Sequence, residues 1–145
     1  MRALGIDLGA KRIGVAVSDP TGTIASPYEV VHRCGDPVRD RRRLVELAEE
    51  VGAERIVVGL PLSMDGSIGP AAAAALDEAD ALGAVTTIPV ETYDERLTTV
   101  TAERALREQN VKGPARRAVV DKVAAAVLLQ AWLDGRPSRE PDPST

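Results

Sequence analysis

Acidic residues stand at three places in the chain where carboxylates could do chemistry together. Asp7 closes the first apolar run, Asp94 and Glu95 close the last one, and Asp121 follows in a stretch with helical periodicity. Asp121 shares a helical stripe with apolar residues three, four, seven and eleven positions later, so it faces the protein rather than solvent. A buried acid is costly unless it is paired or binds a cation.

Converging carboxylates repel one another unless a divalent cation neutralises them. Mg²⁺ and Mn²⁺ prefer oxygen ligands and keep positions open for phosphate oxygens. Such a site suits phosphodiester hydrolysis, in which two metals roughly 3.5–4 Å apart stabilise the attacking and leaving oxygens. The alternative is a structural role, with ion pairs to neighbouring basic residues: Glu95 to Arg96, and Asp121 to Arg117 or Lys122. Spacing alone leaves both readings open, because the chain has no short metal-binding motif.

The elements that must position these acids begin with three strands. Apolar and β-branched residues predict strands over 3–7, 13–19 and 23–31. The first loop is too short for a helical crossover, so the strands form an antiparallel meander.

Strands and helices then alternate along the chain. We expect helices over 38–51, 70–82, 98–109 and 115–133, with Gly52 and Gly83 ending the first two, and strands over 55–60 and 85–93. The order predicts an α/β fold, in which a mixed sheet built from the meander and βα crossovers is flanked by helices. Strands one and four of such a sheet can lie side by side, and a packed helix could bring Asp121 to their ends.

Length and composition are those of one globular domain. The chain has 145 residues, 44% of them apolar, and a net charge of −4, which is the wrong sign for a protein that coats nucleic acid. Aromatic residues make up only 2%, so base recognition through several stacking platforms is not expected. The single cysteine and the lack of a long apolar run favour a cytoplasmic protein without a membrane segment. We expect one domain over residues 1–133 and a disordered tail over 134–145, which holds three prolines.

Four blocks of the sequence together resemble the YqgF-type (RuvX) family. These proteins are described as pre-16S rRNA nucleases and as Holliday junction resolvases related to RuvC. The blocks are GIDLGAKRIGVAVSD (5–19), IVVGLPLSMDG (56–66), DERLTT (94–99) and DKVAAAVLLQAWL (121–133). The resemblance implies an RNase H-like fold with a catalytic and metal-binding site at Asp7, Glu95 and Asp121. Asp94 adjoins Glu95, so which of the two turns inward stays open.

Basic residues near these acids are candidates for contacts with phosphate. They are Lys11, Arg12, Arg96, Arg116, Arg117 and Lys122. The alternative for each is an exposed turn or a solvated helix face. The loop from Gly59 to Gly66 could also meet a nucleic-acid backbone through its NH groups. The arginines at positions 39, 41, 42 and 43 are more typical of a solvated face than of a docking patch.

The leading interpretation is a metal-dependent nuclease that uses Mg²⁺ or Mn²⁺ on structured nucleic acid. The family name favours 5′-end processing of precursor 16S rRNA over resolution of branched DNA. A resolvase would need a homodimer, with two sites facing two strands, whereas an end-trimming nuclease could work as a monomer.

Two other classes of function remain. GIDLG at residues 5–9 also resembles the first phosphate motif of sugar kinases, actin and Hsp70-type ATPases, although those close a nucleotide between two such domains. A non-catalytic nucleic-acid-binding module would have no need of three acids together.

Overall fold

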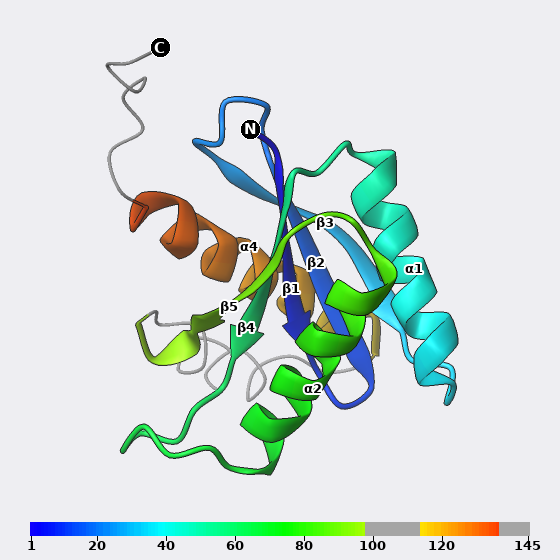
Figure 1. Cartoon of the computed structure of the whole chain (residues 1–145), viewed down its shortest axis with the longest axis vertical. Helices are drawn as coiled ribbons and strands as arrows, with labels where there is room; N and C mark the ends of the chain where they lie inside the picture. The colour runs from blue at the N-terminus through cyan, green and yellow to red at the C-terminus, as the bar shows by residue number, and fades with distance from the viewer. Residues whose placement is uncertain (98–113, 137–145) are drawn as a thin grey trace.

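One five-stranded sheet forms the centre of the protein (Figure 1). The computed structural model describes residues 1–97 and 114–136, with side chains over 1–96 and 121–136. The strands are β1 (Ala3–Leu8), β2 (Arg12–Ser18), β3 (Ala25–His32), β4 (Arg55–Leu60) and β5 (Val90–Asp94), in the spatial order β3-β2-β1-β4-β5. β2 is antiparallel to both β1 and β3, whereas β4 is parallel to β1 and β5 is parallel to β4. The predicted meander and the predicted pairing of strands one and four are confirmed.

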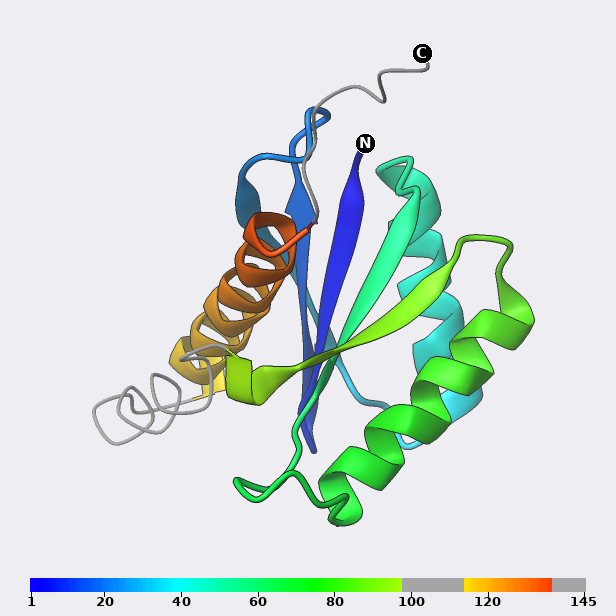
Figure 2. The same ribbon diagram turned by 60° about the vertical axis from the view of Figure 1, so that its left-hand side comes forward.

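Helices cover both faces of this sheet. They are α1 (Pro37–Glu50), α2 (Pro70–Val85) and α4 (Pro114–Asp134), with a short 3-10 helix η1 (Glu95–Leu97) directly after β5. Figure 2 shows α1 and α2 on one face and α4 on the other. Among residues 1–97 and 114–136, no helix combines the length and the apolar character that a membrane span needs.

Alternation along β1 divides its side chains between the two faces. Leu4 and Ile6 belong to the aliphatic core under α1 and α2. Ala3 belongs to the core under α4, and a Cβ on Gly5 would lie 2.8 Å from Cβ of Leu129 in that helix. Successive residues of a strand point to opposite faces, so Asp7 points with Ala3 and Gly5 toward α4.

Local capping sets both ends of α1, through Asp36, which the sequence analysis did not single out, and through Gly52, as predicted. Asp36 accepts hydrogen bonds from the backbone NH groups of Val38 and Arg39, which the first turn leaves without helical partners. At the other end Gly52 adopts φ +66°, the left-handed conformation that glycine adopts without strain.

The predicted junction between α2 and β5 is wrong in two respects. α2 does not end at Gly83 but runs to Val85, because an exposed helical glycine costs only about 0.5–1 kcal/mol and the buried Leu82 holds this turn against the core. The strand begins at Val90 rather than at Val85. Thr86 accepts a hydrogen bond from the NH of Ile88 in a local turn, and Pro89 has no NH to give to a ladder.

The last predicted elements are described only in part. The final helix is present and extends one residue beyond each predicted end, so Asp134 belongs to α4 rather than to a tail. The helix predicted over 98–109 and residues 137–145 lie outside the described residues.

Candidate active site

Asp7 lies near the end of β1 between two glycines. It pairs with Gly14 of β2, and the parallel register that joins Ile6 to Val58 puts Gly59 of β4 on its other side. Only 2% of Asp7 is exposed, and its Oδ2 atom is fully buried. Neither neighbour has a side chain, which leaves room beside the carboxylate for residues from other elements.

Asp121 reaches this place from α4. A Cβ on Gly14 would lie 2.1 Å from the carbonyl oxygen of Asp121, so the helix packs directly on the backbone of β2. Asp121 is 5% exposed, and its Oδ2 accepts a hydrogen bond of 2.7 Å from Nε of Arg12. The sequence correctly placed Asp121 on the buried stripe, and the structure adds a contact with a residue 109 positions away, which helical spacing did not indicate.

Glu95 lies on the β4 side of Asp7. It is the first residue of η1 and is 6% exposed. A Cβ on Gly59 would lie 2.6 Å from Oε1 of Glu95, so the carboxylate rests on the second glycine beside Asp7. The structure therefore gathers the three predicted acids on the α4 face, where β1 and β5 end.

Asp94 turns away from this group. Arg96 donates to both oxygens of Asp94, with Nη2 at 2.8 Å from Oδ2. That contact lowers the pKa of the Asp94 carboxyl. Glu95 is thus the acid that turns inward. The ion pair that Arg96 forms is with Asp94, not with Glu95 as the alternative interpretation expected.

The environment of Glu95 disfavours its charged form. Burial raises the pKa of its carboxyl, and the negative charge of Asp94 raises it further. A cation bound near Glu95 would act in the opposite direction and stabilise the carboxylate.

The carboxylates supply oxygen ligands, which is the chemistry that Mg²⁺ and Mn²⁺ prefer. Within residues 1–97 and 114–136, no three His, Cys, Asp or Glu side chains are already arranged around one metal position. Instead Arg12 puts a positive charge on one of the acids. The residues present fit a divalent cation by type and by burial, provided that their side chains close around it.

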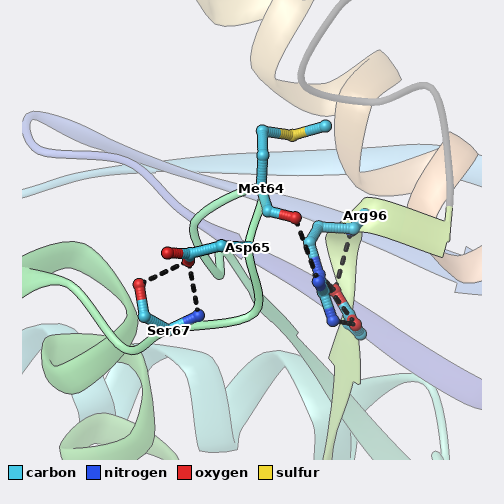
Figure 3. Close-up of polar contacts among 5 residues, drawn as sticks. Met64, Asp65, Ser67 and Arg96 are labelled. Atoms are coloured by element: carbon cyan, nitrogen blue, oxygen red, sulfur yellow. Dashed lines mark hydrogen bonds and ion pairs between the residues drawn. The ribbon is translucent and has the colours of Figure 1, made fainter.

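The loop after β4 is tied to the same end of the sheet (Figure 3). Within it, Asp65 accepts hydrogen bonds from the backbone NH and the hydroxyl of Ser67, and Gly66 adopts φ +88°. Arg96 donates to the carbonyl oxygen of Met64 at 3.3 Å. Arg96 therefore connects this loop to the segment that carries Glu95.

The other predicted phosphate contacts are distributed around the site. Lys11 is exposed at the tip of the β1–β2 hairpin, and Lys122 is half-buried beside Asp121 on α4. The side chains of Arg116 and Arg117 lie outside the described residues.

Arg33 is a further basic residue beside the hairpin that the sequence analysis did not consider. Its NH donates to the carbonyl oxygen of Lys11 at 2.9 Å and its Nε to that of Gly9 at 2.7 Å. It follows the third strand, far along the chain from the hairpin, so no local spacing signals it.

On α1, two of the four arginines are bound to acids within the helical layer. Arg41 forms an ion pair of 2.7 Å with Glu78 of α2, and Arg43 contacts Glu46 and Glu50. Arg39 and Arg42 are exposed, as a solvated face predicts, whereas the Arg41 side chain is only 18% exposed and joins α1 to α2.

The topology and the acids at the strand ends define an RNase H-like fold of the RuvC type. RuvC from Thermus thermophilus, in a structure with a Holliday junction substrate, matches 92% of this chain and 95% of its own with a TM-score of 0.52. At 21% identity that likeness shows the fold alone.

Sequence comparison identifies the family more narrowly. Residues 1–135 match the family described as RuvX, Holliday junction resolvase, and the chain belongs to it. A relative from Mycobacterium sp. (strain KMS) is 48% identical over 136 residues, which is 93% of this chain and 80% of the relative. A relative from Pelotomaculum thermopropionicum is 46% identical over 142 residues, covering 97% and 92%. Both carry the name "Putative pre-16S rRNA nuclease".

Proposed function

We propose that this protein is a metal-dependent nuclease that processes the 5′ end of precursor 16S rRNA in the cytoplasm, during ribosome biogenesis. The observation that carries the proposal is the burial of Asp7 between two glycines on which Asp121 and Glu95, both also buried, are packed. Three acids gathered in this way are costly for a protein that only binds nucleic acid, and they are useful to one that must hold cations. The names of the relatives supply the RNA substrate.

Asp7, Glu95 and Asp121 are the residues that would hold Mg²⁺ or Mn²⁺. When bound, the metal would activate a water and stabilise the leaving oxygen of the phosphodiester. The part played by the chain itself is positional. Asp7 is fixed by strand pairing, Asp121 by the close packing of α4 on Gly14, and Glu95 by its contact with Gly59.

Basic residues at the edge of the site would hold the phosphate backbone. Lys11 and Arg33 lie together at the β1–β2 hairpin, and Lys122 follows Asp121 on α4. Arg12, Arg96, Arg116 and Arg117 complete the proposed set. Phosphate contacts of this kind place a substrate without reading its sequence. The proposed nuclease domain covers residues 1–134, one residue more than the sequence predicted, with the remaining residues as a tail.

One experiment tests the activity and the substrate together. Precursor 16S rRNA and a four-way DNA junction are incubated with equal amounts of enzyme, with and without Mn²⁺, beside Asp7→Asn as the inactive control. We expect Mn²⁺-dependent cleavage of the RNA that Asp7→Asn abolishes. Cleavage of the junction in preference to the RNA would favour resolution of branched DNA by a homodimer, the activity in the family's description. Binding without cleavage of either substrate would support a non-catalytic module.

A further inference from the structure

Arg12 reaches from the hairpin into the acidic site. Its Nε lies 2.7 Å from Oδ2 of Asp121, and the two side chains are only 16% and 7% exposed. Short hydrogen bonds between charged groups are the strong kind, and burial shields this one from water. The guanidinium therefore occupies a carboxylate that the proposed function assigns to a metal ion.

A divalent cation and a guanidinium repel each other when both sit on one carboxylate. In the metal-free protein, Arg12 supplies positive charge that offsets the repulsion among the buried acids. Removal of one partner from a buried ion pair leaves an uncompensated charge. A divalent cation that binds Asp121 in place of Arg12 lowers the cost of losing this contact.

The backbone of Arg12 is fixed, so an exchange would involve the side chain alone. The carbonyl oxygen of Arg12 accepts a hydrogen bond of 2.9 Å from the NH of Gly9, and Arg12 lies opposite His32 in the pairing of β2 with β3. Lys11 precedes it on the exposed side of the hairpin, and Arg33 is bonded to the same loop. An Arg12 side chain turned away from Asp121 would join these two basic residues at the edge of the site.

We infer that Arg12 exchanges partners: it neutralises Asp121 in the metal-free protein, and a divalent cation displaces it toward the phosphate backbone of the substrate. This inference rests on the proposed function, because it requires Asp121 to be a metal ligand. Contact of Arg12 with Asp121 and binding of the metal oppose each other, and such opposition is reciprocal. The basic contact would then become available only in a protein already loaded with metal.

The direct test is calorimetric titration of the full chain with Mn²⁺, in wild type and in Arg12→Gln. We expect the variant to bind Mn²⁺ about tenfold more tightly, within the roughly 5–150-fold range of typical coupling between sites. Arg41→Gln is the matched control. It breaks an ion pair of the same 2.7 Å length and similar exposure, between α1 and α2 on the other face of the sheet, and should leave Mn²⁺ affinity unchanged.

A second measurement needs no variant. Nuclear magnetic resonance of the ¹⁵N-labelled wild type follows the Nε–H signals of Arg12 and Arg41 during titration with Mg²⁺. We expect the Arg12 signal to lose its hydrogen-bonded shift and its protection from exchange as the metal binds. The Arg41 signal should stay in place.

The outcomes separate the exchange from the proposed function. If Arg12→Gln binds Mn²⁺ no more tightly than wild type, or if the Arg12 signal is unchanged by saturating Mg²⁺, Arg12 is a structural clasp for α4 and the exchange is wrong. The proposed metal site still stands in that case, provided that Asp7→Asn loses the Mn²⁺ binding seen in wild type. If wild type binds no Mn²⁺ at all, the proposed function fails and the exchange fails with it.

Discussion

At the scale of single residues, the position of Asp7 is set mainly by its backbone. It is 2% exposed, and strand pairing fixes its backbone on the side of β2. Asp7→Asn keeps the shape and removes one negative charge from a crowded group. Without metal we expect the melting temperature to be equal to or above that of wild type, because the remaining acids repel less. With Mn²⁺, the stabilisation that metal gives to wild type should be absent from the variant.

Thermal unfolding in EDTA and in Mn²⁺ measures both effects. A variant that melts far below wild type in EDTA would mean that the Asp7 carboxylate holds the fold together rather than a cation.

Glu95 gives a residue-scale prediction about pH. Because burial and the charge of Asp94 raise its pKa in the folded protein, folding favours the protonated form. Its contribution to stability is therefore complete below the pKa of the unfolded chain and is lost as pH rises through the higher folded value. Glu95→Gln stays neutral, so in EDTA its melting temperature should rise relative to wild type between acidic and neutral pH. A difference between the two proteins that is constant with pH would contradict this account.

At the scale of elements, the packing of α4 on β2 depends on Gly14. A methyl group there would lie 2.1 Å from the carbonyl oxygen of Asp121, and neither strand nor helix backbone can yield easily. We expect Gly14→Ala to lower the free energy of unfolding by about 1–3 kcal/mol, the usual cost of overpacking, and to weaken Mn²⁺ binding by displacing Asp121. Chemical denaturation and metal titration measure the two effects. Unchanged Mn²⁺ affinity would show that Asp121 is not a ligand.

Gly83 provides the opposite prediction on α2. It lies inside the helix and is exposed, and a Cβ there would have no atom within 4 Å apart from its chain neighbours and the backbone of its own helix. Gly83→Ala should raise the free energy of unfolding by about 0.5–1 kcal/mol, because alanine loses less conformational entropy in a helix. Denaturation by urea measures whether the free energy of unfolding rises or falls. A loss of stability would show that the last turn of α2 is not helical in solution.

At the scale of the whole molecule, charge predicts how nucleic acid is held. The net charge of −4 disfavours general affinity, so binding should depend on the basic residues around the site. For duplex DNA we expect log affinity to fall against log salt with a slope of roughly −3 to −4, about 0.9 for each phosphate contacted. Replacing Arg116 and Arg117 together by glutamine should flatten that slope by about one to two. Fluorescence anisotropy over a salt series measures it, and an unchanged slope would show that these two arginines only face solvent.

The sequence by itself determined which of the described elements form and in what order. Apolar periodicity located the meander, β4 and α4, and Gly52 located the end of α1, because these signals act between near neighbours. The prediction of the boundary between α2 and β5 was wrong because contacts beyond the local sequence signal decided it. Gly83 is a local stop signal, but the burial of Leu82 and the lack of an NH on Pro89 decided where the helix ended and the strand began.

Only the tertiary structure decided how the acids meet. Glu95 packs on Gly59 and Asp121 packs on Gly14, and each glycine belongs to another element. Asp121 also contacts Arg12, which no spacing within a helix could indicate. Strand order sets which residues become neighbours, and side-chain charges act over a few ångströms in space regardless of their separation along the chain. The acidic and basic residues of this site could therefore be predicted from the sequence, whereas their contacts depend on the packing of α4 and β5 around β1.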